Sequence, residues 1–392
     1  MRIAIIGLRG IPAKYGGTEV FVEEIVTRLK DKFDFYVMHE DSKFYEDSYH
    51  GIRRIHAPAI ESKSTSIPTI NDLITTIYLY SKHHDKIDLF YFLGPDSSPA
   101  AILPKLGRKK VLINPDGIEW KRLIRRSRFA PFYILPLYLI TMIYMYLMEF
   151  LSCKLADVVV ADSRGIQKHL EQKHKPEKTV YIAYGARELV TPAVSKEEEA
   201  EILGGYELNL GEYYLTVARI VAENNIHMEV EGFKRSKSKK KLVIVGNFNR
   251  KDPYTKHLLK LKGKNVIFLD PIYDKKVLGV LRKNCFAYIH AYEVGGTNPS
   301  LLEQMLFRRP ILAYDVPFNK EVLQEGGIYF KDAEDLASKM EMLERGEFDL
   351  RLIKKTQIKR IKRQYNWGKV ARMYERLFRT LIRRGKGDGI DC

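Results

Sequence analysis

The sequence predicts an α/β protein made of two Rossmann-like domains, each built on a parallel sheet. Short apolar runs of strand length alternate with longer segments of helical periodicity along the chain, which is typical of parallel sheets covered by helices. The alternation restarts near residue 210, after the polar segment 191–212. With 392 residues, 45% of them hydrophobic, the chain is long enough to bury a separate core in each domain.

We expect an N-terminal domain over residues 1–190 and a C-terminal domain over residues 191–370. The expected strands cover residues 1–7, 33–39, 51–57, 87–94, 110–115, 157–162 and 179–185 in the first domain, and 213–219, 241–246, 265–270, 285–291, 310–315 and 326–330 in the second. Because ligands of open parallel sheets bind beyond the carboxyl ends of the strands, two facing sheets predict an interdomain cleft.

Charge and cysteine content restrict the class of protein. The 66 Lys and Arg against 49 Asp and Glu give a net charge of +17, which favours an anionic partner such as nucleic acid, phospholipid or a diphosphate. Cys153, Cys285 and Cys392 lie far apart without metal-ligand spacing, which argues against a disulfide framework or structural zinc. The opening run "MRIAIIGLRG" lacks the pattern of a secretory signal and is typical of a buried strand, so we expect a cytoplasmic protein.

A glycine loop follows the first strand. In "RGIPAKYGGTEVFVEEI", residues 9–25, Gly16 and Gly17 precede an amphipathic helix. Glycine permits positive φ and a close approach of ligand to the main chain, and a helix N-terminus attracts phosphate or sugar groups. The spacing does not match the dinucleotide fingerprint. Ligand contact and an ordinary turn both remain open here.

A second loop of this kind lies in "HAYEVGGTNPSLLEQM", residues 290–305. Asn298 suits the N-cap of the following helix and Pro299 its first position, so free N–H groups there would favour an anion. Glu303, one turn into the helix, would accept hydrogen bonds from sugar hydroxyls. A capping or surface role is the alternative for this glutamate.

Two stretches bear on a membrane. Residues 129–148, "FAPFYILPLYLITMIYMYLM", contain no charge and follow the basic run "KRLIRRSR". Their length admits a transmembrane helix, but strands of one sheet are expected on both sides, so we favour a helix dipping into the cytoplasmic leaflet beside the arginines. A buried core helix is the other alternative. The basic helical stretch 351–385 would serve the same anionic surface, or form a solvated face.

Six motifs resemble retaining GT-B glycosyltransferases of family 4, in particular their bacterial rhamnosyltransferase-like branch. They are "GLRGIPAKYGGTEVFVEEI", "NPDGIEWKR", "ADSRGI", "VARIVAENN", "EVGGTNPSLLEQM" and "YNWGKVARMYERLF". The resemblance implies transfer of a sugar from a nucleotide diphosphate, with dTDP-L-rhamnose as the leading donor and a lipid-diphosphate-linked saccharide as acceptor. It also implies that the terminal helix, 371–392, returns to the N-terminal domain.

The resemblance assigns donor-binding roles to individual residues. Arg219 matches the arginine that pairs with the donor diphosphate, which suits a permanently charged guanidinium. Glu303 matches the second acid of a glutamate pair and would hold the nucleotide ribose, while Gly16 and Gly17 match the loop near the diphosphate and acceptor. The loop residues Glu293, Gly296, Thr297 and Asn298 are further candidates for the donor sugar.

Three positions depart from the family pattern. Asn224 stands where relatives often have a second diphosphate-binding lysine, and nine residues rather than seven separate Glu293 from Glu303. Asn114, Pro115 and Asp116 stand where many relatives have a histidine that contacts the 6-hydroxyl of the donor sugar. Losing that contact is consistent with a 6-deoxy sugar such as rhamnose. Asp116 is a candidate catalytic residue or an ordinary turn aspartate.

The mechanism that the resemblance implies needs no protein nucleophile, metal or cofactor. The departing phosphate oxygen takes the acceptor proton in a front-face attack, and the protein positions the reactants and stabilises the diphosphate charge; no D-x-D pair stands at a strand end. Transfer of a UDP-hexose such as glucose is the alternative. A nucleic-acid-binding protein is a remote one, because "KRSKSKKK" at 234–241 has no interleaved aromatics, so no nucleic acid partner is expected.

Overall fold

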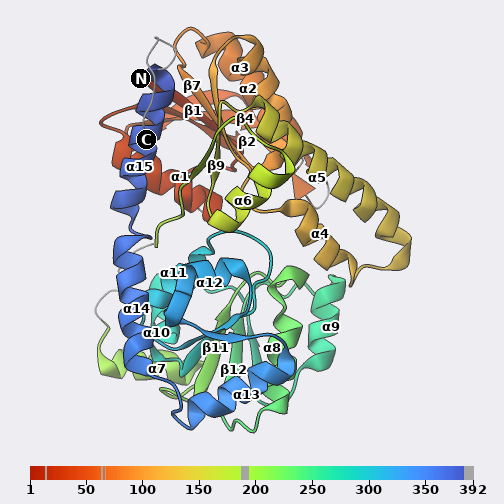
Figure 1. Cartoon of the computed structure of the whole chain (residues 1–392), viewed down its shortest axis with the longest axis vertical. Coiled ribbons are helices and arrows are strands. Elements are labelled where there is room, and N and C mark those ends of the chain that lie inside the picture. Colours follow the sequence, from red (N-terminus) through yellow and green to blue (C-terminus); the bar gives the residue numbers. More distant parts are fainter. Residues whose placement is uncertain (14–15, 63–64, 67, 187–193, 384–392) are drawn as a thin grey trace. The chain divides into compact units, whose positions relative to one another are not determined.

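The computed structural model describes residues 1–13, 16–62, 65–66, 68–186 and 194–383. Two compact units make up the chain. The first contains Met1–Trp120, Thr141–Gly185 and the segment from Asn366, and the second contains Lys121–Ile140 and Ala186–Tyr365. Each has a mainly or wholly parallel sheet covered by helices, as the sequence predicts (Figure 1).

The units do not follow the expected ranges. Their boundaries fall at 185/186 and 365/366 rather than at 190 and 370. In addition, residues 121–140 belong to the second unit although they lie within the N-terminal half of the sequence. This exchange rests on ion pairs between residues more than 90 positions apart, which local sequence patterns do not encode.

The sheet of the first unit has the strand order β10-β9-β8-β7-β1-β2-β4-β3. The strands are β1 (Arg2–Ile6), β2 (Asp34–Asp41), β3 (Tyr45–Tyr49), β4 (Ile52–Pro58), β7 (Leu89–Leu93), β8 (Lys110–Asn114), β9 (Val158–Ala161) and β10 (Thr179–Tyr181); β5 (Glu61–Ser62) and β6 (Thr65–Ser66) form a separate short pair. The central strands are buried on both faces, which explains their continuous apolar runs.

One strand of this sheet is not among the strands that the sequence predicts. β3, "YEDSY", pairs antiparallel with β4 at the sheet edge, whereas the other pairings of the sheet are parallel. An exposed edge strand has no buried apolar face to reveal it. It is held by polar pairs instead, such as the Arg54 guanidinium with the Asp47 carboxylate.

The helices of the first unit lie on both faces of the sheet. They are α1 (Gly17–Leu29), α2 (Pro68–His83), η1 (Pro95–Ala101), α3 (Ile102–Leu106), α6 (Arg164–Lys173) and α15 (Trp367–Arg383), with most of α5 (Leu135–Leu155). α1 and α15 pack side by side, and Figure 1 shows them on the face opposite α2 and α3. The α15 side chain Tyr374 reaches Tyr91 of β7, with 3.0 Å between the two hydroxyls.

The second unit has the strand order β13-β12-β11-β14-β15-β16, all parallel. These strands are β11 (Tyr213–Val217), β12 (Lys241–Val245), β13 (Val266–Leu269), β14 (Ala287–His290), β15 (Ile311–Tyr314) and β16 (Ile328–Phe330). Each overlaps a strand expected from the sequence. β11 and β14 are neighbours at the centre although two strands separate them along the chain.

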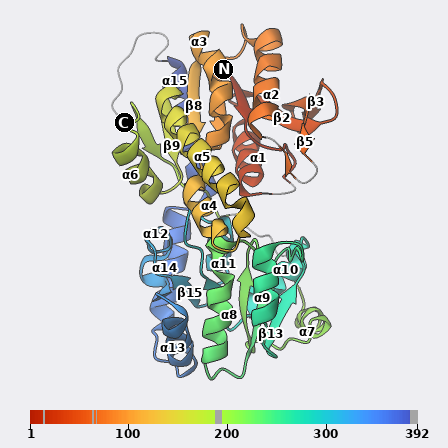
Figure 2. The same ribbon diagram turned by 90° about the vertical axis from the view of Figure 1, so that its right-hand side faces the viewer.

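Helices cover both faces of this sheet as well. They are α4 (Glu119–Ser127), η2 (Phe132–Ile134), α7 (Lys196–Gly205), η3 (Ala222–Asn224), α8 (Ile226–Arg235), α9 (Pro253–Leu261), α10 (Lys275–Asn284), α11 (Pro299–Leu306), α12 (Pro317–Leu323), η4 (Gln324–Gly326), α13 (Ala333–Glu344) and α14 (Leu350–Arg363). α8 packs against α9 and α13, and α11 against α14. Figure 2 shows α8 and α9 side by side.

The apolar segment forms one long helix with most side chains in solvent. Phe132–Leu155 is long and apolar enough to cross a membrane by length and composition, with mean hydropathy 1.7 in its most apolar window, of which 6% is buried. Within α5 itself the buried side chains are Glu149, Ser152 and Cys153. The alternative of a buried core helix at 129–148 is therefore wrong.

Candidate functional site

The candidate site lies in the second unit, at the point where two neighbouring strands are followed by helices on opposite faces of the sheet. After β11 the chain continues into α8, and after the neighbouring β14 it continues into α11, which lie on opposite faces. The two chain segments diverge at the carboxyl ends of these strands, which is the position where open α/β sheets bind ligands. The predicted residues 219–224 and 293–303 follow these two strands.

The loop after β11 presents an arginine. Arg219 is exposed, and its carbonyl oxygen accepts a 2.6 Å hydrogen bond from Asn224 Nδ2. Asn224 is itself buried, and its Oδ1 has no hydrogen-bond partner within the described residues. The asparagine at the position of the missing lysine therefore closes the Arg219 loop.

The start of α11 has the predicted cap. Asn298 is the N-cap and Pro299 occupies the first turn. Asn298 Oδ1 accepts from the backbone N–H of Ser300 at 2.9 Å and of Leu301 at 3.4 Å. The expectation that the N–H groups at this helix start are free is thus corrected for these two, because the cap already satisfies them.

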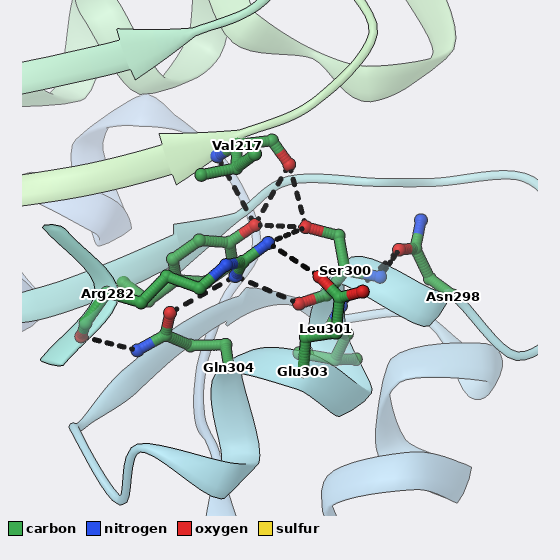
Figure 3. A network of polar contacts seen from close by, with 8 residues as sticks. Val217, Arg282, Asn298, Ser300, Leu301, Glu303 and Gln304 are labelled. Carbon is green, nitrogen blue, oxygen red and sulfur yellow. Dashed lines mark hydrogen bonds and ion pairs between the residues drawn. The ribbon is translucent and has the colours of Figure 1, made fainter. Parts of the chain in front are cut away.

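A buried arginine connects α10 to α11 (Figure 3). Arg282 Nη2 donates to Glu303 Oε2 at 3.1 Å and to Ser300 Oγ at 2.9 Å, while Nη1 donates to Ser300 O and to Gln304 Oε1, each at 3.2 Å. The Arg282 side chain is 1% exposed and the Glu303 side chain 20% exposed. Glu303 is therefore an ion-paired carboxylate that still reaches solvent.

The same network continues to the end of β11. Ser300 Oγ donates to the carbonyl of Val217 at 2.9 Å, and the Tyr288 hydroxyl lies 3.0 Å from that carbonyl and 2.9 Å from Ser300 Oγ. The Arg282 guanidinium lies over the Tyr288 ring, 5.5 Å from its centroid. Contacts from β11, β14 and α10 thus hold the first turns of α11 in place (Figure 3).

Glu293 is also paired, with a residue that the sequence analysis did not connect to it. Its carboxylate forms an ion pair with Arg125 of α4 and accepts a 3.3 Å hydrogen bond from Asn225 Nδ2. The neighbouring acid, Glu223, is fully buried, and Arg126 Nε donates to both of its oxygens at 3.1 Å. These two ion pairs attach α4 to the second unit.

The glycine pair of this loop is tightly packed. Gly295 has φ +152, and a Cβ there would lie 1.8 Å from Tyr292 Oη and 2.9 Å from Arg122 Nη2. Arg122 Nη2 itself donates to Tyr292 Oη at 2.9 Å. Gly296 and Thr297 are buried. This loop therefore requires glycine at 295 for backbone conformation and for space.

The first unit presents its glycine loop in the equivalent position, after β1 and beside β7. Gly16 is the N-cap of α1 with φ −137 and makes no side-chain cap, and α1 begins at Gly17. Neither glycine has a positive φ. Gly7 (φ +95) and Gly10 (φ +135) do, and their missing Cβ atoms leave room for Leu93 O and the His39 ring.

Asp116 lies in the turn after β8. It has φ +56, its N–H donates to Asn114 Oδ1 at 2.9 Å, and its Oδ1 accepts from the Tyr184 hydroxyl at 3.1 Å. This is the conformation of a turn aspartate, and its carboxylate remains half-buried in the first unit.

Another polar group lies apart from these loops. Glu149 Oε1 accepts from His169 Nε2 at 2.8 Å and from His174 Nε2 at 2.7 Å. Among the described residues this is the one His and carboxylate group close enough to hold a metal ion. The carboxylate, whose pKa is lowered by the two histidines against the effect of burial, binds α5 to α6 through hydrogen bonds.

The comparisons with known proteins place the second unit in a family. Residues 208–364 match the family model "Glycosyl transferases group 1". This region is therefore similar to glycosyltransferases of group 1. Residues 1–187 match a model described as "Domain of unknown function (DUF1972)". No curated protein matches the sequence.

Solved GT-B glycosyltransferases share the fold over nearly the whole chain. Sucrose-phosphate synthase from Thermosynechococcus elongatus is 18% identical with a TM-score of 0.75, over 97% of this chain and 98% of that one. Anabaena Alr3699/HepE in complex with UDP is 15% identical with a TM-score of 0.69, over 97% and 100%. α,α-Trehalose 6-phosphate synthase from Burkholderia multivorans is 11% identical with a TM-score of 0.71, over 100% and 99%. The predicted GT-B fold is confirmed, and the family match of residues 208–364 supports glycosyl transfer as the class of activity.

The sequence did not reveal the arginines that form ion pairs with the glutamates of the second unit. Arg282 lies in a helix whose sequence is that of an ordinary amphipathic helix, and the position of Arg125 and Arg126 before the apolar segment favours a role as membrane anchors. Glu223, directly before Asn224, also went unnoticed. The only local signal was an excess of arginine in α4, and it did not indicate carboxylate partners about 100 and 170 residues away.

Proposed function

We propose that the protein transfers L-rhamnose from dTDP-L-rhamnose to a lipid-diphosphate-linked saccharide, with retention and without a metal, as in family 4. The observation that supports this proposal is the arrangement of side chains where the chain segments after β11 and β14 of the second unit diverge. There the exposed Arg219 and the partly exposed carboxylate of Glu303 follow two adjacent strands of a glycosyltransferase domain. One cation and one carboxylate suit the diphosphate and the sugar hydroxyls of a nucleotide sugar.

The chemistry assigned to these residues is electrostatic and positional. The Arg219 guanidinium stabilises the charge that grows on the diphosphate as the glycosidic bond breaks, and Glu303 accepts a hydrogen bond from the pentose. Asn224 holds the Arg219 loop in place by donating a hydrogen bond to the Arg219 carbonyl. The loop at Gly296, Thr297 and Asn298 lies beside the sugar, while the paired Glu293 holds that loop to Arg125.

The assignment of a 6-deoxy sugar as donor is based on the residues at the end of β8 and in the turn that follows it. The family histidine that would satisfy a 6-hydroxyl is replaced there by Asn114, Pro115 and Asp116. The Asp116 carboxylate is engaged by Tyr184 in the same unit, so it makes a poor substitute for the histidine. A sugar without a 6-hydroxyl needs no such partner.

A UDP-hexose is the second candidate donor. Anabaena Alr3699/HepE has been solved with UDP, with UDP and glucose, and with UDP-glucose. A trehalose-6-phosphate structure from E. coli contains UDP-2-fluoro glucose. These ligands are those of distant structures, whereas the missing histidine is a property of this chain.

Association with the inner face of the plasma membrane completes the proposal. Apolar side chains of η2 and α5 project into solvent, among them Phe132 at 83%, Leu137 at 63% and Ile140 at 64% exposure. A continuous apolar surface of this kind suits the acyl boundary of a bilayer. Arg125 and Arg126 are paired with Glu293 and Glu223. We therefore assign most of the binding free energy for the membrane to this apolar surface rather than to these arginines.

A donor panel tests the proposal. The purified protein is incubated with dTDP-L-rhamnose, UDP-glucose or UDP-galactose and an undecaprenyl-diphosphate-linked saccharide, and products are read by mass spectrometry. We expect rhamnose transfer to exceed hexose transfer at least tenfold. Equal or better glucose transfer would replace the rhamnose assignment by the UDP-hexose one, and salt-sensitive nucleic-acid binding without any transfer would contradict glycosyl transfer itself.

A further inference from the structure

Arg282 determines how much of the Glu303 carboxylate a ligand can use. The guanidinium occupies Glu303 Oε2, and Oε1 has no hydrogen-bond partner within the described residues. Figure 3 shows one oxygen turned toward Arg282 and the other turned away from it. The carboxylate therefore offers one fully open oxygen, not two.

The position of Arg282 is fixed by its surroundings. Its side chain is almost completely buried and donates to two oxygens of Ser300 and to Gln304. Gln304 Nε2 in turn donates to the Arg282 carbonyl at 3.3 Å. A guanidinium held by this many contacts cannot follow a carboxylate that rotates toward a ligand, so Glu303 keeps its orientation.

Ribose and 2′-deoxyribose make different demands on such a carboxylate. The 2′- and 3′-hydroxyls of ribose are adjacent donors, and a carboxylate binds the pair most strongly when both of its oxygens are free, so that each oxygen accepts from one hydroxyl. A 2′-deoxyribose has the 3′-hydroxyl alone. One open oxygen matches one hydroxyl.

We infer that Arg282 makes the donor site indifferent to the 2′-hydroxyl, so that 2′-deoxyribonucleoside diphosphates bind as well as ribonucleoside diphosphates. The inference rests on the proposed function, in which Glu303 contacts the pentose of the donor. It assigns Arg282 a positioning role that determines pentose specificity.

Three uridine nucleotides isolate the pentose from the base. UDP, 2′-deoxy-UDP and 2′,3′-dideoxy-UDP are titrated into the full-length protein by calorimetry. We expect UDP and 2′-deoxy-UDP to bind within about threefold of each other and the dideoxy compound about tenfold more weakly, the loss typical of one hydrogen bond to a charged group. A preference of tenfold or more for UDP over 2′-deoxy-UDP would overturn the inference and leave nucleotide binding standing.

Two variants assign the effect to the ion pair. Glu303→Ala should bind 2′-deoxy-UDP and the dideoxy compound equally, and the exposed control Glu325→Ala should behave as the wild type. Arg282→Met frees Oε2, so the affinity for UDP should rise about tenfold relative to the affinity for 2′-deoxy-UDP. Simple destabilisation of the protein would not produce this change in the ratio.

The remaining outcomes separate the two proposals. If Arg282→Met does not fold, the wild type and Glu303→Ala still decide the question. Equal binding of 2′-deoxy-UDP and the dideoxy compound by the wild type would remove Glu303 from the pentose and overturn the inference. Binding of none of the three nucleotides would overturn the inference, and if dTDP did not bind either, the proposed function would be contradicted as well.

Discussion

The charged residues of the second unit divide into those with a fixed partner and those facing solvent. Glu223, Glu293 and Glu303 are each paired with an arginine, whereas Arg219 is exposed and its guanidinium has no ion pair within the described residues. An unpaired cation at the end of a central strand is the group most available to an anionic ligand.

Arg219→Ala tests this availability. We expect turnover to fall by roughly two orders of magnitude, because a charge-assisted contact to the diphosphate is lost in the transition state. The melting temperature should not change, since the side chain is exposed. Steady-state transfer rates and thermal unfolding measure the two effects.

Arg351→Ala is the matched control, an exposed arginine of α14 in the same unit. It removes the same charge away from the strand ends and should leave turnover unchanged. Near-normal turnover in a folded Arg219→Ala protein would exclude Arg219 from the site.

At the scale of elements, α5 differs from the other helices within the described residues. It is apolar nearly all round, yet the residues it buries are Glu149, Ser152 and Cys153. A helix that turns its polar side to the protein and its apolar side to water is unfavourable in solution alone. Contact with a lipid surface would remove this cost.

Leu139, Ile143 and Leu147 test the membrane contact, because they lie one turn apart and are 50–56% exposed. Replacing all three by glutamine should lower the partition coefficient on vesicles containing anionic lipid at least about tenfold, since each loses part of its transfer free energy. Co-sedimentation measures the bound fraction. The substitutions should not unfold the protein.

Leu210→Gln is the control, a 65% exposed leucine outside this helix. Unchanged vesicle binding by the triple variant would contradict the surface proposal. Protease access to the two flanks of α5 from opposite sides of a sealed vesicle would show that the helix spans instead.

At the scale of the whole molecule, stability depends on the pH through a carboxyl group buried beneath the second sheet. Glu229 is fully buried, its Oε2 accepting from Thr216 Oγ1 at 2.6 Å and its Oε1 from the Ala291 N–H at 3.2 Å. Burial raises the pKa of this carboxyl to about 8. It thus joins β11 to the end of β14 as a neutral acid at low pH.

Glu229 predicts how stability changes with pH. Its pKa is raised in the folded state, so between about pH 4.5 and 8 the folded protein binds more protons than the unfolded chain, and the free energy of unfolding falls as pH rises through that window. Glu229→Gln, which does not titrate, should show a flatter dependence. Calorimetric melting at pH 5, 6, 7 and 8 compares the two.

The exposed Glu325→Gln should follow the wild type across the same pH series. Parallel pH dependences for Glu229→Gln and wild type would mean that the Glu229 carboxyl does not titrate in this window. Calorimetry is required because both tryptophans, Trp120 and Trp367, belong to the first unit.

The sequence by itself determined the α/β class, the strands with buried apolar runs and the cap of α11. These features depend on periodicity and on residue types close together in the chain, such as Asn298 before Pro299. Thus the loops that follow β11 and β14 could be named as a candidate site before their geometry was known. The edge strand β3, whose residues are polar, could not.

Only the tertiary structure decided which partners the site residues have. The ion pair between Arg125 and Glu293 joins residues 168 positions apart, and the one between Arg282 and Glu303 joins two helices separated by a strand. The tertiary structure also places residues 121–140 in the second unit, where Arg125 pairs with Glu293. It places the positive φ angles at Gly7 and Gly10, close to Leu93 O and the His39 ring. Partner choice of this kind depends on where the fold brings distant side chains together, which no local pattern records.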